Sequence, residues 1–179
     1  KLLNEATNAG VKSIVDLTPY RDINLYRQIA DRTTINIIAS TGYYTSSKMP
    51  LYLQNHTELQ MEERMYKEVT EGIAGTNIKA GVIKLAADKQ PLNEWEKKVI
   101  RAAEKVQKET KIPIATHAWT GVRDQFDMLV KSGADLKHIN FGHIETEPGW
   151  KGKKREQMAN ELLPIVQNGG YLLFNNFSC

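Results

Sequence analysis

The chain has 179 residues, 41% of them hydrophobic, which is enough for one domain with a core of ordinary size. Its formal net charge of +3 is small and evenly mixed, so the sequence predicts no nucleic-acid partner. No apolar run approaches the roughly 20 residues of a membrane span, which predicts no membrane partner. The single cysteine, Cys179, favours a reducing compartment and hence a cytoplasmic location.

Short apolar runs alternate with segments of helical spacing along the chain. In order, the pattern predicts a helix end over residues 1–6, strand 11–16, helix 21–32, strand 35–40, helix 57–73, strand 80–86, helix 93–110, strand 112–117, helix 121–131, strand 138–143, helix 155–166 and strand 171–174. The third helix begins with Thr57-x-x-Gln60, the form of a capping box. Because the strands lack period-two polarity, we expect a parallel sheet covered on both faces.

Two architectures fit this order, a doubly wound open sheet and a (β/α)8 barrel. An open sheet of this class usually carries a Gly-rich first turn or a P-loop, and the sequence has neither. A barrel typically takes about 250 residues in eight units, so six strands fall short by two units. The sequence therefore predicts an α/β fold of the (β/α)8 TIM-barrel type that covers strands two to seven only, in a single partial domain of residues 1–179.

Three neighbouring strands are each predicted to carry an ionisable side chain near the C-terminal end. These side chains are Lys84, His117 and His143. A buried charge costs several kcal/mol unless a partner or metal compensates it, and reacting groups of a barrel lie at this end of the strands. Taken singly, each residue is more often structural or solvated. Together, on successive strands, they predict one converging site.

Two imidazoles and a lysine can bind metal only if the lysine is not an ammonium, which has no lone pair to give. Reaction with carbon dioxide converts the free amine to a carbamate, an anionic oxygen ligand that can bridge two cations. Imidazole and carboxylate-like oxygen suit Zn, and also Mn, Co or Fe. A water that bridges such ions becomes the hydroxide nucleophile, while the ions polarise a carbonyl or phosphoryl oxygen.

The sequence resembles the phosphotriesterase family of the amidohydrolase superfamily, which includes phosphotriesterase-like lactonases and phosphotriesterase homology proteins. The resemblance covers nearly the whole chain. Its most specific part is residues 72–76 (GIAGT) with residues 78–84 (IKAGVIK), followed by Thr116-His117 and Gly142-His143.

The resemblance implies roles for four residues. Lys84 would be the carboxylated lysine that bridges two metals, and His117 and His143 would hold one of them. Tyr44 matches a tyrosine that reaches toward the metal-bridging water. The family's other ligands, a His-x-His pair and an Asp, belong to the strands that this chain lacks. The chain also departs from the family at Asn175, where an Asp is usual, and at Thr146.

We therefore expect a binuclear-metal-dependent hydrolase of an ester-like bond, with a small lactone, carboxylic ester or phosphoester as substrate; a homodimer is left open. Trp119 and Trp150 would wall the substrate pocket or pack inside the barrel. One alternative is a Schiff-base aldolase with Lys84 as the amine nucleophile. The other is an incomplete or degenerate barrel fragment without catalysis.

Overall fold

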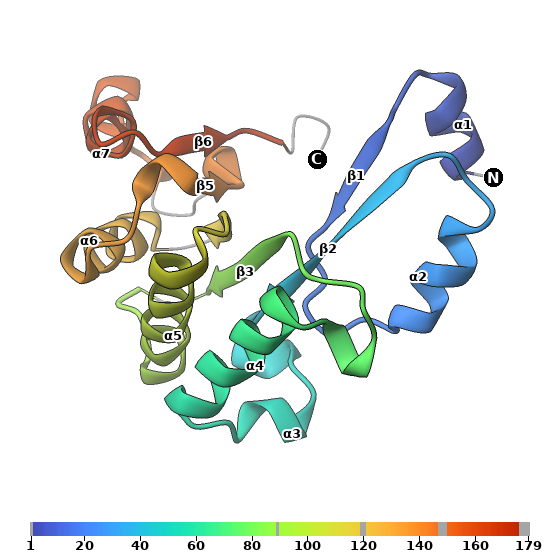
Figure 1. The fold of residues 1–179 in the computed structure, drawn as a ribbon. Coiled ribbons are helices and arrows are strands. Elements are labelled where there is room, and N and C mark those ends of the chain that lie inside the picture. The colour runs from blue at the N-terminus through green and yellow to red at the C-terminus, as the bar shows by residue number, and fades with distance from the viewer. Residues whose placement is uncertain (1, 89, 119–120, 147–149, 176–179) are drawn as a thin grey trace.

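The computed structural model describes residues 2–88, 90–118, 121–146 and 150–175, and strands alternate with helices along it (Figure 1). The strands are β1 (Ser13–Asp16), β2 (Asn36–Gly42), β3 (Val82–Ala87), β4 (Ile114–Ala118), β5 (Ile139–Gly142) and β6 (Tyr171–Leu173). The α-helices are α1 (Leu2–Asn8), α2 (Ile23–Ala30), α3 (Leu51–Gln54), α4 (Glu58–Thr70), α5 (Glu94–Thr110), α6 (Val122–Ser132) and α7 (Arg155–Gln167). Over these ranges, no helix is both long enough and apolar enough to cross a bilayer.

The strands form one parallel sheet in strictly sequential order, β1-β2-β3-β4-β5-β6. A doubly wound sheet reverses its strand order at a switch point, whereas a barrel adds each strand beside the last. The sequential order therefore confirms the prediction of a partial (β/α)8 barrel. Each of the strands β1 to β5 in Figure 1 is followed by helical structure that returns the chain to the start of the next strand.

Alternate residues of the three central strands, β3, β4 and β5, pack into the helix layer. Ile83 and Leu85 of β3, Ile114 of β4, and Ile139 and Phe141 of β5 belong to one buried cluster with residues of α4, α5 and α6. Because side chains alternate between the faces of a strand, their neighbours in sequence face the barrel interior. Lys84 of β3 and His117 of β4 are among these inward-facing residues.

The predicted elements agree with the observed ones to within a few residues. The capping box of α4 is confirmed, since Gln60 N donates to the Thr57 side chain and Thr57 N donates to the Gln60 side chain. Helix α3 and the 3-10 turns η1 (Ser46–Lys48), η2 (Ile73–Gly75), η3 (Leu136–His138) and η4 (Ile144–Thr146) were not predicted. These segments are too short for a hydrophobic periodicity to reveal them.

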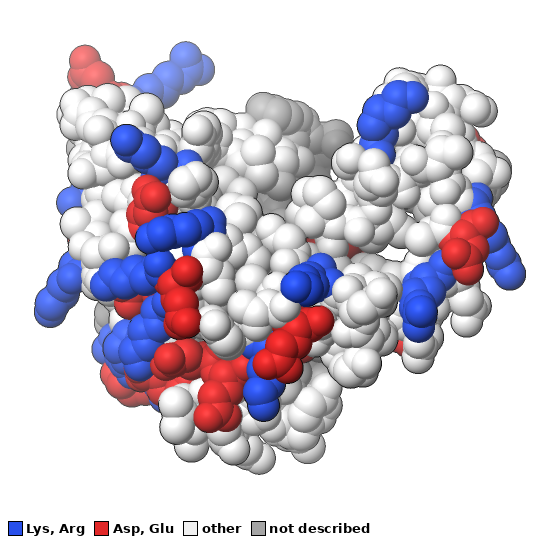
Figure 2. All heavy atoms as spheres, in the orientation of Figure 1, with Lys and Arg blue, Asp and Glu red and all other residues white. Residues whose placement is uncertain are grey.

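Helices α4 and α5 pack side by side and are joined by charged side chains. The Glu58 carboxylate lies 2.7 Å from Arg101 Nε and 3.2 Å from Lys105 Nζ, and Glu62 also pairs with Lys105 at 3.1 Å. Figure 2 shows the two signs of charge interleaved on this face of the molecule. Part of the positive charge is thus already paired within the chain.

Candidate metal centre

Lys84 is the third residue of β3, and three strand residues follow it. The predicted strand, 80–86, had only two residues after Lys84, so the lysine lies one residue farther from the strand end than predicted. The strand continues to Ala87 because Leu85, Ala86 and Ala87 pair with β4. Ile83 and Leu85 face the helices, so the Lys84 side chain faces the other way, and the residue is only 4% exposed. Burial lowers the pKa of the Lys84 amine from 10.5 to about 8.

His117 lies on β4, opposite Ala86 of β3. Since Ala86 is two residues from Lys84, and successive side chains of a strand alternate between its faces, His117 and Lys84 belong to the same face. Burial lowers the pKa of His117 to about 4, with further lowering by the positive charge of Lys84 and by His143. The imidazole is therefore uncharged at neutral pH and keeps a lone pair for a ligand.

His143 follows β5 and reaches the same place by a different route. Gly142 lies opposite His117, so a regular strand would send the next side chain toward the helices. Instead, His143 has a φ of 61°, in the left-handed region that is uncommon for residues other than glycine. Its ring then lies edge-on to that of His117, with centroids 4.5 Å apart.

These three donors fit part of a metal site. Among the residues that the structure describes, no three His, Cys, Asp or Glu side chains are grouped as a metal site, and Lys84 is the further side chain that the sequence analysis placed with the two histidines. The donor chemistry is suitable, because one imidazole is uncharged and the amine gives up its proton near neutral pH. The chemistry of these side chains is thus compatible with a metal, and their role as ligands stays a prediction.

Tyr44 joins the cluster from the end of β2. Its hydroxyl lies 3.1 Å from His117 Nε2, within hydrogen-bond distance, and the ring centroids are 5.1 Å apart. Burial raises the pKa of Tyr44, with smaller contributions from Tyr20 and Asp88, so the phenol is protonated at neutral pH. The Tyr44 hydroxyl therefore lies next to the His117 ring, which would hold a cation.

The neighbouring residues that the sequence pointed to behave differently from one another. Trp150 is buried, and its Nε1 donates to Ile144 O over 2.5 Å, so it packs beneath the segment that follows His143. Trp119 lies outside the described residues. Asn175 N donates to a Glu145 carboxylate oxygen over 3.0 Å, which ties the chain after β6 to the chain after β5.

Residues on the outer side of the site were missed by sequence reasoning. Tyr43 is fully buried and its hydroxyl lies 2.7 Å from His56 Nδ1, while Arg64 lies with its guanidinium 5.1 Å from the Tyr43 ring centroid. These contacts join residues 13 to 21 positions apart in no regular pattern. The only sequence signal is a pair of adjacent tyrosines at a strand end, which periodicity does not interpret.

The fold and this residue set define an incomplete (β/α)8 barrel with a lysine and two histidines gathered toward the carboxyl ends of three consecutive strands. The chain belongs to the Phosphotriesterase family, whose sequence model matches residues 1–179. This finding confirms the family that the sequence motifs indicated.

Three known proteins illustrate the similarity. The chain is 38% identical over 149 residues to an aryldialkylphosphatase of Saccharolobus solfataricus, covering 79% of this chain and 47% of that protein. It is 34% identical to an N-acetyltaurine hydrolase of Dictyostelium discoideum, covering 94% of this chain and 45% of that protein. It superposes on the crystal structure of the Escherichia coli phosphotriesterase homology protein, complexed with phosphate in the active site, with a TM-score of 0.82. That match has 25% identity and covers 98% of this chain and 59% of the other.

The chain thus spans about half the length of the curated relatives it matches. The two named relatives are both hydrolases by name.

Proposed function

We propose that the protein is a metal-dependent hydrolase of an ester-like bond in a small molecule, a lactone, a carboxylic ester or a phosphoester. Lys84, His117 and His143 would be ligands of two divalent metals, and Tyr44 would act beside them. The observation that carries the proposal is the pair of imidazoles 4.5 Å apart on the barrel face that also bears a buried lysine.

Lys84 would serve as a carbamate. With a pKa of about 8, roughly a quarter of the amine is unprotonated at pH 7.5, against about 0.1% for an ordinary lysine. The free amine attacks carbon dioxide, the new C–N bond forms, and one proton is released to solvent. The resulting anion has two oxygen donors, and divalent cations held beside it would offset the cost of burying its negative charge.

His117 and His143 would hold the cation as neutral imidazoles, and zinc is the metal that this donor set favours, with Mn, Co or Fe as the other candidates. When bound, the metals would lower the pKa of a water and polarise the carbonyl or phosphoryl oxygen of the substrate. The low pKa of His117 means that protons do not compete with a metal at neutral pH.

Tyr44 would orient the reacting groups. Its hydroxyl is a neutral donor at pH 7, and it is within hydrogen-bond distance of His117 already. With His117 holding a metal, the Tyr44 hydroxyl would be close enough to the site to donate to the attacking water or to the substrate oxygen.

Metal analysis tests the proposal directly. The protein should bind transition metal, lose hydrolysis on chelation and regain it on adding zinc. His143→Asn should lower metal content, whereas His138→Asn should not, because His138 precedes β5 at its opposite end, where its Nδ1 lies 3.0 Å from an Asp135 carboxylate oxygen. A protein that binds no metal and hydrolyses equally well in chelator would refute the proposal.

The carbamate has a spectroscopic signature of its own. Incubation with 13C-bicarbonate and zinc should give a carbamate carbon signal by NMR that is absent in Lys84→Met. Absence of the signal in the metal-loaded wild-type protein would remove the bridging role proposed for Lys84.

A substrate panel would decide between the classes. Lactones, aryl esters and phosphotriesters belong in it, and so do N-acyl amides, because one relative is an N-acetyltaurine hydrolase by name. Trapping of Lys84 by borohydride with a carbonyl substrate would support the aldolase alternative instead. Metal binding without turnover of any substrate would favour a barrel without catalysis.

A further inference from the structure

The segment 42–44 at the end of β2 contacts two groups of the candidate metal centre at once. Gly42 lies opposite Lys84 in the β-ladder, and Tyr43 N donates to Lys84 O over 2.9 Å. Tyr44 presents its hydroxyl to His117. A displacement of this segment would therefore move the Tyr44 hydroxyl relative to the ligands.

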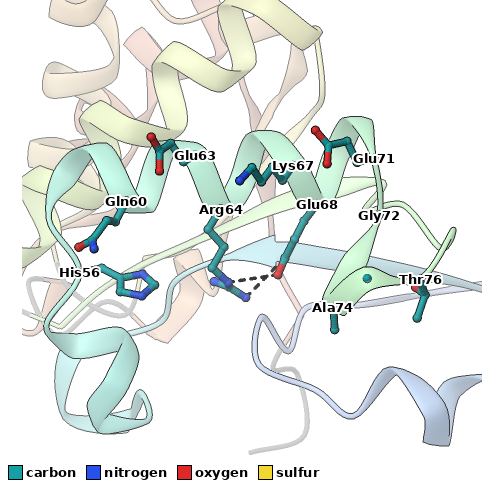
Figure 3. A pocket seen from close by; sticks show the side chains of 11 residues that line it. His56, Gln60, Glu63, Arg64, Lys67, Glu68, Glu71, Gly72, Ala74 and Thr76 are labelled. Carbon is teal, nitrogen blue, oxygen red and sulfur yellow. Dashed lines mark hydrogen bonds and ion pairs between the residues drawn. The ribbon is translucent and has the colours of Figure 1, made fainter.

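Arg64 on α4 holds this segment from the outer side. Its guanidinium donates from Nη1 to Gly42 O over 3.0 Å and from Nη2 to Pro19 O over 2.7 Å. Gly42 is the last residue of β2, and Pro19 follows β1 by three residues. One arginine side chain therefore joins the ends of two neighbouring strands. Figure 3 shows the guanidinium lying beside Glu68, with which its Nε pairs at 3.1 Å.

The contacts of Arg64 are largely shielded from water. The Arg64 and Glu68 side chains are 18% and 12% exposed. Hydrogen bonds from a charged donor are about twice as strong as neutral ones, and they are screened little in such surroundings. A lysine cannot replace them, because only the planar guanidinium has donors spread in a fixed fork.

Tyr43 passes this restraint to the neighbouring Tyr44. The Tyr43 ring is fully buried between the Arg64 guanidinium and the Trp95 ring, whose centroid lies 5.7 Å away. Trp95 Nε1 in turn donates to Tyr44 O over 3.3 Å. The backbone of Tyr44 is thus held by a side chain of α5 and, through Tyr43, by a side chain of α4.

We propose that Arg64 is a positioning residue for the candidate metal centre, fixing segment 42–44 and thereby the Tyr44 hydroxyl against His117. It acts through Gly42 and Tyr43 and touches no reacting atom. The catalytic part of this inference rests on the proposed function, whereas the positional part can be tested without any substrate.

The chain offers a matched control in Arg123 on α6. Arg123 pairs with Asp127 four residues on, at 3.0 Å, and lies 5.3 Å from the Phe126 ring centroid. Arg64 has the same two kinds of contact, with Glu68 and Tyr43. The two arginines differ in one respect: within the described residues, Arg64 also donates hydrogen bonds at the ends of strands, and Arg123 does not.

The test combines Arg64→Ala with chemical rescue in the metal-loaded protein. Arg64 borders an open cavity of about 600 Å³, also lined by His56, Glu68 and Ala74, through which a guanidinium ion can reach the vacated position (Figure 3). The positional readout is the indole N–H signal of Trp95 by NMR, identified among the three tryptophans with Trp95→Phe. The catalytic readout is kcat against KM.

Arg64→Ala should shift the Trp95 signal and lower kcat by on the order of 10- to 100-fold with little change in KM, since a displacement of about 1 Å costs up to that much. Millimolar guanidinium, far below denaturing concentrations, should reverse both changes, and Arg123→Ala should show neither. If Arg64→Ala does not fold, Arg64→Lys should keep the charge, lose the fork and show a smaller loss in the same direction.

An unshifted Trp95 signal with unchanged kcat would overturn the inference, as would a loss of kcat that leaves the Trp95 signal in place. If the wild-type protein hydrolyses nothing, the proposed function fails, but the Trp95 signal and its rescue still decide whether Arg64 positions the segment.

Discussion

Replacing Gly42 by alanine should separate the candidate site from the strand that supports it. A Cβ added at Gly42 would lie 2.1 Å from Lys84 O, 2.8 Å from Lys84 N and 2.9 Å from Lys84 C. All three are backbone atoms of the neighbouring strand, so no side chain can rotate to make room. Relief to an ordinary contact of 3.4 Å requires the added Cβ and Lys84 O to separate by at least 1.3 Å, so the end of β2 has to move away from Lys84.

The expected magnitude has two parts. Gly42 has a φ of 107°, and a side chain in the left-handed region costs about 1 kcal/mol. Forcing an extra methyl group into a packed region costs typically 1–3 kcal/mol more. We therefore expect Gly42→Ala to lower the free energy of unfolding by about 2–4 kcal/mol, and kcat by roughly 100-fold, since Tyr44 moves with the segment.

Gly10→Ala is the control for the backbone conformation alone. Gly10 has a φ of 87° and nothing within 4 Å of its added Cβ. It should therefore cost about 1 kcal/mol of stability and leave hydrolysis unchanged. Chemical denaturation and steady-state kinetics of both variants are the assays. Equal stability and equal activity of the two would refute the contact between Gly42 and Lys84 as a determinant of the site.

Three further predictions address single side chains. In metal-free protein without bicarbonate, Lys84→Met should be more stable than wild type by about 3 kcal/mol at pH 7, because the unfolded amine (pKa 10.5) binds a proton more tightly than the buried one (pKa about 8). Wild-type stability should rise relative to the variant between pH 8 and 10.5, and a difference that does not vary with pH would contradict the low pKa. Tyr44→Phe should lower kcat by roughly 10- to 100-fold and leave metal content unchanged, and equal loss of metal would show that the phenol has a structural role instead. Glu96→Gln should cost about 1–3 kcal/mol in denaturation, because the fully buried carboxylate accepts from Asp88 N at 2.7 Å and Asn93 N at 2.8 Å; wild-type stability would contradict this.

The alternation of strands and long helices could be predicted from the sequence. Each strand is a short apolar run and each long helix has an apolar stripe, so the order of elements follows from local patterns. The face shared by Lys84 and His117 also follows from period two, once the register is known. Register itself is a pairing between distant segments, and no local pattern specified that Lys84 lies opposite Gly42 and Ala115.

Two features of the site were beyond sequence reasoning for physical reasons. His143 faces His117 because of a left-handed backbone angle, which a histidine adopts only where the surrounding structure imposes it. Arg64 donates to Gly42 O and Pro19 O, which lie 22 and 45 residues away in the chain. The helical periodicity around Arg64 predicts which face of α4 is apolar, but it does not predict the partners of a single arginine. The most distinctive motif, GIAGT, lies away from the strand ends that carry the candidate site. Ile73 N donates to Ile78 O there, in a turn between α4 and β3.

The position of each predicted ligand along its strand bears on where a substrate would approach under the proposed function. Lys84 is two residues deeper in the sheet than the level of His117, and Ala115 and Asn140 are the strand residues in register with it. The imidazoles and the Tyr44 hydroxyl lie above it, toward the carboxyl ends of the strands. In complete barrels side chains fill the interior below this level, so under the proposed function a substrate would arrive from the segments that follow the strands. If the proposed function holds, substitutions in those segments should change which substrate is hydrolysed, whereas substitutions of Lys84 and His117 should lower metal content.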